Sequence, residues 1–254
     1  MKFKYLPVLM IIAFLSSCED EPFANTDKST FYDDMADITV LNGYFYSTNH
    51  DLSGHAGSQI DLLKFEMNGA DIFLSDRYAL EINGQGYMAI TNDGSNLFLQ
   101  SHDTQLIMKY SSVGERGFLG YDELSTSWLP AGLAYNPDTD SLLTLHRNSQ
   151  NLNEFRLRSI SKDSLDKPSR DEIFQLEFME RAYHGVYAME YHDSLFYILG
   201  VDSIHQDLLL ILDNSLSLVS MDTLSDTSVV GLCFKNSDLF LSHADKRIEW
   251  FATY

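Results

Sequence analysis

The stretch Leu129-Pro-Ala-Gly-Leu-Ala-Tyr-Asn-Pro-Asp-Thr-Asp-Ser-Leu-Leu-Thr-Leu145 contains the unit from which this chain is built. An apolar run starts at Gly132, a polar turn covers residues 136–140, and a second apolar run covers residues 142–145. Asn, Pro, Asp and Ser favour turns, and short runs of aromatic and branched residues between turns are typical of strands. The stretch therefore predicts two strands joined by a tight turn.

The same pattern recurs along the chain. Apolar runs that open with glycine lie 46 to 53 residues apart, at Gly86, Gly132, Gly185 and Gly231. The second apolar runs start at Tyr44, Leu97, Leu142, Leu195 and Leu239. Third runs cover residues 60–65, 106–110, 152–157, 208–212 and 248–251, and looser fourth runs cover 72–74, 118–119, 173–178 and 218–221. Four short strands in about 45–50 residues is the period of a β-propeller blade.

The repeat predicts an all-β fold, a β-propeller of five four-stranded blades. A six-bladed ring with one degenerate blade is the alternative. The fifth unit ends at Tyr254, directly after its third strand. We expect the segment from Phe23 to Tyr32 to supply the missing strand and close the ring, because an open blade would leave unpaired edge groups.

The start of the chain has the layout of a secretory signal. Lys2 and Lys4 precede an apolar run over residues 5–14, which is shorter than the roughly 20 residues that span a bilayer. Leu15-Ser-Ser-Cys18 resembles the bacterial lipobox, and this resemblance implies cleavage before Cys18 and acylation of Cys18 with palmitate-like chains. We therefore expect a lipoprotein signal peptide over 1–17, a lipidated N-terminus and tether over 18–30, and a propeller domain over 31–254.

The acidic run Glu19-Asp20-Glu21 resembles the surface-export signal of Bacteroidetes lipoproteins. The expected location is the outer membrane, with Cys18 as the lipid anchor. Whether the domain faces the cell surface or the periplasm stays open at this point.

Charge and motifs exclude several classes of function. The net charge of −20 repels phosphate backbones, so we expect no nucleic-acid partner. Once Cys18 is lipidated, Cys233 is the only thiol left, and it lies in an apolar run where burial is expected. The sequence has no Gly-x-Ser-x-Gly, His-Glu-x-x-His, Cys-x-x-Cys or P-loop motif, so we predict no cofactor and no metal. Whether the protein is an enzyme is not decided by these motifs.

The units resemble those of the NHL-like and SdiA-regulated propeller families, and the closest match is the stretch over 129–145. The resemblance covers most of residues 36–254 and implies a propeller without implying an activity. These families often carry Asp near the end of the second strand, where His is commoner in this chain.

In a propeller, the loops from second to third strand and from each blade to the next share one face with the channel mouth. The candidate ligand rim on that face consists of His50, Asp51, His102, Asp103, His146, Asp202, His243, Asp245, Trp128 and His184. His and carboxylate side chains together can bind metal or relay protons. Polar residues at strand ends also satisfy backbone groups, and aromatic packing between blades is the favoured role of Trp128 over stacking on a ligand.

Two functions remain open from the sequence. The first is a non-catalytic binding module, anchored to the outer membrane, that binds a protein or a glycan through its loop rim. The alternative is a propeller hydrolase or lyase with a His/Asp or metal site at the channel mouth.

Overall fold

The computed structural model describes residues 34–50, 60–69, 71–80, 88–101, 105–121, 127–164, 167–176, 188–201, 206–225, 228–245 and 247–251. Every regular element in these ranges is a β-strand. Within the same ranges there is no helix long and apolar enough to cross a membrane.

The strands form five antiparallel sheets, which we number as blades 1 to 5 in chain order. Blade 1 contains β1 (Asp34–Leu41), β2 (Tyr44–His50), β3 (Asp61–Asn68) and β4 (Asp71–Ala79). Blade 2 contains β5 (Met88–Asn92), β6 (Leu97–Ser101), β7 (Leu106–Tyr110) and β8 (Arg116–Tyr121). Blade 3 contains β9 (Trp128–Asn136), β10 (Ser141–Asn148), β11 (Glu154–Ser161) and β12 (Arg170–Gln175). Blade 4 contains β13 (Met189–His192), β14 (Leu195–Val201), β15 (Asp207–Leu212) and β16 (Leu218–Thr223), and blade 5 contains β17 (Val229–Lys235), β18 (Asp238–His243) and β19 (Ile248–Phe251).

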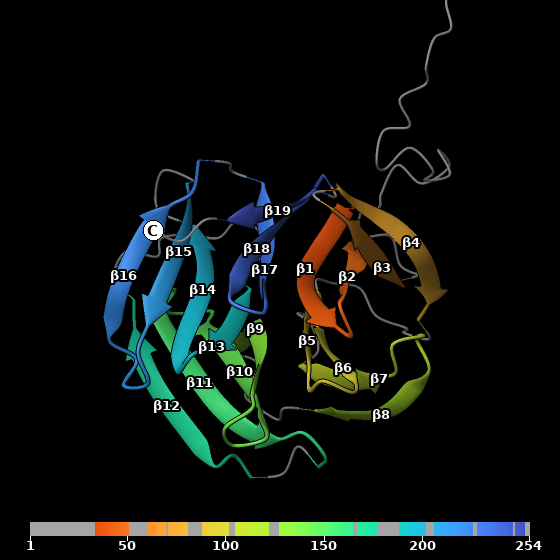
Figure 1. Cartoon of the computed structure of the whole chain (residues 1–254). Helices are drawn as coiled ribbons and strands as arrows, with labels where there is room; N and C mark the ends of the chain where they lie inside the picture. Colours follow the sequence, from red (N-terminus) through yellow and green to blue (C-terminus); the bar gives the residue numbers. More distant parts are fainter. Residues whose placement is uncertain are drawn as a thin grey trace, which may run out of the picture.

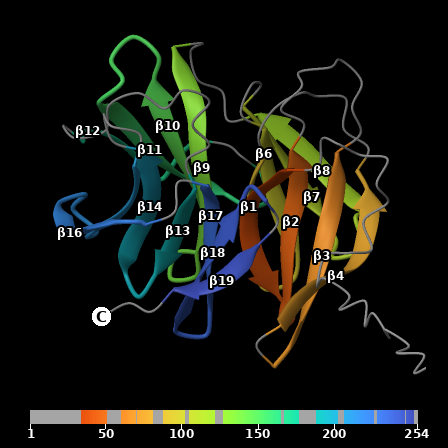
Figure 2. The same cartoon turned by 90° about the horizontal axis from the view of Figure 1, so that it is seen from above.

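The blades surround one axis, and the first strand of each blade is innermost (Figures 1 and 2). Each of these strands contacts the first strands of the two neighbouring blades, in the order β1, β5, β9, β13, β17 and back to β1. The red-orange strand β1 accordingly lies next to the dark blue strand β17 in Figure 1. The fold is therefore the predicted five-bladed propeller, and the six-bladed alternative is wrong.

Packing between the blades holds this ring together. The buried apolar side chains of the described residues form five clusters, one at each boundary between adjacent blades. At the boundary between blades 1 and 5, the rings of Phe45 and Phe240 meet edge to face with their centroids 5.0 Å apart. Cys233 belongs to the same cluster and is buried, as its apolar run predicted. Because this cluster joins the last blade to the first, the ring is closed by packing.

The tight turns confirm the repeat read from the sequence. In every blade, the turn from first to second strand contains a residue with a positive φ: Asn42, Gly94, Asp140, Asp193 and Asn236. Gly, Asn and Asp accept this left-handed backbone at low cost. We call the face with these turns and the turns from third to fourth strand the turn face. The opposite face, with the loops from second to third strand and from blade to blade, is the loop face.

Blade 5 has three strands among the described residues, with β19 at its outer edge. The segment from Phe23 to Tyr32, expected to provide the fourth strand, lies outside the described residues. The start of β1 nevertheless contacts the last blade, since the N–H of Met35 donates to the carbonyl of Ala244 in the β18–β19 turn.

Some strand boundaries differ from the sequence prediction. The third strand of blade 3 begins at Glu154, two residues later than expected, because the N–H of Glu154 donates to the carbonyl of Asn151 and keeps Leu152 in a turn. The first strand of blade 3 begins at Trp128, well before Gly132, and continues past an irregularity in pairing opposite Leu145 and His146.

Candidate functional site

Two of the predicted rim histidines, His146 and His243, occupy equivalent positions in their blades. His146 on β10 pairs with Pro130, and His243 on β18 pairs with Val229, each directly beyond a β-bulge in the innermost strand. Both side chains are fully buried. Bulges are over-represented next to functional sites because they re-aim side chains, so the surroundings of each ring decide what it can do.

His146 is buried within blade 3, on its second strand. Burial, and after it the guanidinium of Arg156, lowers the pKa of His146 from 6.5 to about 3, while Asp171 opposes the shift. Arg156 in turn forms a two-pronged contact with Asp171, at 2.6 and 2.7 Å. His146 is therefore a neutral imidazole at physiological pH. It lies near the ion pair that Arg156 forms with Asp171.

Trp128 contacts the same arginine, Arg156. Its side chain is buried, and the guanidinium of Arg156 lies over its ring, 5.6 Å from the centroid. The amide of Gln105 in blade 2 donates to the carbonyl of Trp128 at 2.6 Å. The backbone of Trp128 is thus tied to blade 2, while its ring contacts Arg156 within blade 3.

His243 has different polar neighbours, among them residues in and beside blade 5. The hydroxyl of Ser228 lies 3.1 Å from Nδ1, and a carboxylate oxygen of Glu249 lies 3.1 Å from Nε2. A guanidinium nitrogen of Arg247 lies 3.4 Å from Nδ1, and Arg247 also forms an ion pair with Asp245 at 2.8 Å. This group of hydroxyl, imidazole, carboxylate and guanidinium is the candidate functional site on the loop face.

The backbone fixes the same group. The N–H of His243 donates to the carbonyl of Arg247, and the N–H of Ala244 donates to the carbonyl of Ser228, both at 2.9 Å. The N–H of Val229 donates to the carboxylate of Asp207 in blade 4 at 3.1 Å. The site is therefore held at the boundary between blades 4 and 5, where β17 enters the ring.

A second polar feature lies at the axis of the propeller. The carboxylate of Asp37 on β1 accepts hydrogen bonds from the N–H groups of Ile38 at 2.8 Å, and of Ile90 and Leu232 at 3.3 Å each. Ile90 and Leu232 lie on the innermost strands of the two neighbouring blades. Burial raises the pKa of Asp37 well above its ordinary value although these N–H groups act in the opposite direction. Asp37 thus joins three inner strands by satisfying their edge donors.

Glu190 on β13 adds a second acid near the axis. Burial raises its pKa from 4.5 to about 8, against a hydrogen bond from the N–H of Tyr191. The side chain is surrounded by protein but keeps some accessible surface, as expected for a group beside the axis of a ring. Burial, and after it the carboxylates of Glu190 and Asp37, raise the pKa of the Cys233 thiol. The thiol is therefore unreactive at neutral pH.

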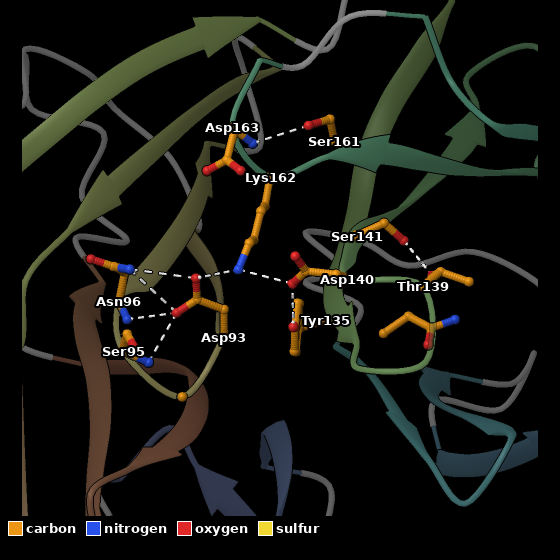
Figure 3. A network of polar contacts seen from close by, with 12 residues as sticks. Asp93, Ser95, Asn96, Tyr135, Thr139, Asp140, Ser141, Ser161, Lys162 and Asp163 are labelled. Carbon is orange, nitrogen blue, oxygen red and sulfur yellow. Dashed lines mark hydrogen bonds and ion pairs between the residues drawn. The ribbon is translucent and has the colours of Figure 1, made fainter.

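The turn face carries a polar network between blades 2 and 3 (Figure 3). The ammonium of Lys162 lies 3.2 Å from Asp93 and 2.8 Å from Asp140. Burial would raise the pKa of Asp93, but the N–H groups of Asn96 and Ser95 and the ammonium of Lys162 outweigh it and hold the pKa below its ordinary value. The side chain of Asp93 is 3% exposed. Lys162 is thus a clamp between two blades.

The remaining predicted site residues are not placed by the structure. His50 is the last residue of β2, where its backbone pairs with Asp34. Its side chain lies outside the described part of the structure. Cys18, Asp51, His102, Asp103, His184 and Asp202 lie outside the described residues. In the described part of the chain, no group of three or more His, Cys, Asp or Glu residues could hold a metal ion.

Several site residues were missed from the sequence, although some left a signal. Asp37 interrupts a buried apolar strand, and Glu190 pairs at the rung where the other innermost strands carry Thr39, Ile90, Leu133 and Leu232. A polar residue in such a column is informative because buried acids need partners. Ser228, Arg247 and Glu249 carried no comparable pattern.

No protein-family model matches the chain, and no curated protein matches it. Among solved structures, it is similar to a chain of the nidogen/laminin complex, with a TM-score of 0.52 and 10% identity over 82% of this chain and 72% of that one. It is also similar to a protein of unknown function from Bacteroides caccae, with a TM-score of 0.46 and 10% identity over 75% of this chain and 63% of that one. A third similar structure is streptogramin B lyase, with a TM-score of 0.43 and 11% identity over 88% of this chain and 95% of that one. At this identity the likeness to the first of these structures shows the fold alone, in agreement with the β-propeller described above.

Proposed function

We propose that this protein is an exported lipoprotein of the outer membrane whose propeller binds a protein or a glycan partner through its loop face. The observation that carries the proposal is a pair of half-exposed leucines on that face of blade 3. Leu129 at the start of β9 and Leu152 in the β10–β11 loop are each 39% exposed. They flank Arg147, which pairs with Leu129 across the sheet and donates to the carbonyl of Leu152 at 2.6 Å.

Apolar side chains that stay exposed on the loops of a rigid frame can contribute to a contact surface. The frame here is the closed ring, and the buried side chains of Trp128 and His146 support the same end of blade 3. The similar fold in the nidogen/laminin complex belongs to an assembly of two proteins. That structure supports the proposal as an example of a chain with a similar fold in a complex with another protein.

The anchor is the second part of the proposal. Cys18 holds the chain in the membrane through its acyl chains, and several acyl chains hold a protein more firmly than one. Growth with an alkyne-tagged palmitate should label the wild-type protein, and Cys18→Ser should remove the label. Protease treatment of intact cells then distinguishes a domain on the cell surface from one that faces the periplasm. Membership of the NHL-like propeller families is likewise part of this proposal, on the strength of the stretch over 129–145.

Binding is tested with the mature protein in pull-down experiments on isolated envelopes and on a glycan array. The loop-face variant carries Leu129→Asp and Leu152→Asp. The matched control is Val113→Asp, which changes a 51% exposed apolar residue in the β7–β8 turn on the turn face. A partner retained by the wild type and the control but lost from the loop-face variant supports the proposal. Retention by all three proteins, or by none of them, contradicts it.

A further inference from the structure

Ser228, His243 and Glu249 form a line that runs outward through blade 5. Ser228 directly precedes the innermost strand β17, His243 ends β18, and Glu249 lies in β19. The two contacts along the line are 3.1 Å each, from the Ser228 hydroxyl to Nδ1 and from Nε2 to the Glu249 carboxylate. A nucleophile within hydrogen-bond reach of a base, with the base oriented by a third group, is the arrangement that activates a serine.

The neighbours of the imidazole fix the position of its proton. A guanidinium can only donate hydrogen bonds, and Arg247 faces Nδ1 at 3.4 Å. Nδ1 therefore presents its lone pair and the ring proton is on Nε2, which lies 3.1 Å from a carboxylate oxygen of Glu249 without the alignment of a hydrogen bond. The same lone pair faces the hydroxyl of Ser228 at 3.1 Å, which is nearer than the guanidinium of Arg247 at 3.4 Å. The two ring nitrogens are used in the opposite order from the chymotrypsin triad, but the roles of base and orienting carboxylate are the same.

Burial suits these roles. The imidazole of His243 is fully covered, which keeps its orientation fixed, while Ser228 is partly exposed and the side chain of Glu249 is 46% exposed. Arg247 is 44% exposed beside Nδ1, so a cation stands next to the place where the nucleophile would react. Cationic donors of this kind stabilise the oxyanion that forms in acyl transfer.

We propose that Ser228 is the nucleophile of an acyl-transfer site that hydrolyses carboxylic esters, with His243 as general base and Glu249 as a positioning residue. The Ser228 oxygen forms a bond to the ester carbonyl carbon as its proton passes to Nδ1 of His243. The carbon–oxygen bond to the alcohol then breaks, and the alcohol leaves with that proton. Water attacks the acyl-serine, gives its proton to Nδ1, and the acid departs as Ser228 regains a proton.

This proposal is independent of the partner binding proposed above, because it rests on blade 5 and the partner surface lies on blade 3. The test uses the mature protein, a fluorophosphonate probe located by peptide mass spectrometry, and p-nitrophenyl acetate as the ester. We expect one phosphonate adduct, on Ser228, and ester hydrolysis that Ser228→Ala abolishes. Ser217→Ala, which changes a serine on the turn face, is the matched control and should keep both the adduct and the rate.

Glu249→Gln separates a catalytic arrangement from a structural one. Gln retains the size of Glu but offers no charge to the imidazolium that forms, so kcat should fall at least about tenfold with KM little changed. Glu249→Asp should recover part of the loss. A wild-type protein that forms no adduct at Ser228, or a Ser228→Ala variant that hydrolyses the ester as fast as wild type, overturns the proposal. So does a Glu249→Gln variant with unchanged kcat.

Discussion

The carboxylate of Asp37 on the innermost strand of the first blade accepts a hydrogen bond from the N–H of Leu232 on the innermost strand of the last blade, at 3.3 Å. The two residues are 195 positions apart in the sequence. The other oxygen of the same carboxylate accepts the N–H of Ile90 in blade 2. One buried acid therefore ties blade 1 to both of its neighbours at the point where the ring closes.

Asp37→Ala should destabilise the protein strongly. The change removes the acceptor for N–H groups at the axis, and each buried donor left without a partner costs about 1–3 kcal/mol. We expect the free energy of unfolding in urea to fall by about 2–4 kcal/mol. Asp37→Asn, which keeps one acceptor oxygen, should lose less, and Asp76→Ala, on the exposed outer strand β4, should change stability by no more than about 1 kcal/mol. Equal losses for Asp37→Ala and Asp76→Ala would contradict this role.

Glu190 should make the protein less stable as the pH rises. Its pKa is raised in the folded chain, from 4.5 to about 8. Between these two pH values the folded chain therefore keeps a proton on Glu190 that the unfolded chain has lost. The contribution of Glu190 is present below pH 4.5 and is lost as the pH rises toward 8, with a slope of at most about 1.4 kcal/mol per pH unit. Because the side chain keeps some accessible surface, the slope should be gentler than this limit. Urea unfolding of wild type and Glu190→Gln from pH 5 to pH 8 measures the difference, and parallel curves for the two proteins are the result that this account does not allow.

Lys162→Met should loosen the boundary between blades 2 and 3. The change leaves the carboxylate of Asp93, which is 3% exposed, without its ammonium partner. We expect a loss of about 1–2 kcal/mol, smaller than for a fully buried pair because Lys162 is partly exposed. The matched control is Lys64→Met, whose ion pair with Asp76 lies within blade 1 and should contribute no more than about 1 kcal/mol.

The same clamp gives an acid dependence. The pKa of Asp93 is lowered in the folded chain, so its contribution is present above the ordinary value of 3.8 and is lost as the pH falls through the lower folded value. Lys162→Met should weaken this dependence below pH 4. If wild type and Lys162→Met lose stability in parallel as the pH falls, the clamp is not what holds the pKa of Asp93 down.

Gly231→Ala should be destabilising although alanine is the smallest change available. A Cβ atom at this position would lie 2.6 Å from the Cα of Asp37 and 2.5 Å from the hydroxyl of Ser242, so the inner strands of blades 1 and 5 would have to separate. Overpacking of this kind costs about 1–3 kcal/mol. Gly117→Ala on β8, where the nearest atom would be 3.3 Å away, is the milder comparison, and thermal melting of both variants should rank them in that order.

The strands and turns could be predicted from the sequence because they repeat. The third strands of blades 2 and 5 were predicted to the residue, and all five turns from first to second strand carry the expected turn residues. Blade 1 was harder, because β1 carries no glycine at the start of its apolar run and the repeat gave no reason to look at Asp37.

The candidate site could not be predicted in the same way. His243 was expected on the rim from the ends of the second strands, but its partners depend on the pairing of β17, β18 and β19, which brings Ser228 and Glu249 to opposite sides of one ring. Pairing register and bulges decide which side chains meet, and a one-residue shift would reverse every side chain of a strand. The neutral, buried state of His146 could not be predicted either, because the polar residues Arg147 and Asn148 that follow it in the sequence do not indicate burial.

The most direct test of the central claim is an experimental structure of the mature protein, at a resolution that places the side chain of Asp37. The account predicts five sheets around one axis, with β1 between β5 and β17 and the Asp37 carboxylate in contact with the N–H groups of Ile90 and Leu232. A sixth sheet between the strands of Leu232 and Asp37, or a gap there that breaks this contact, would contradict it.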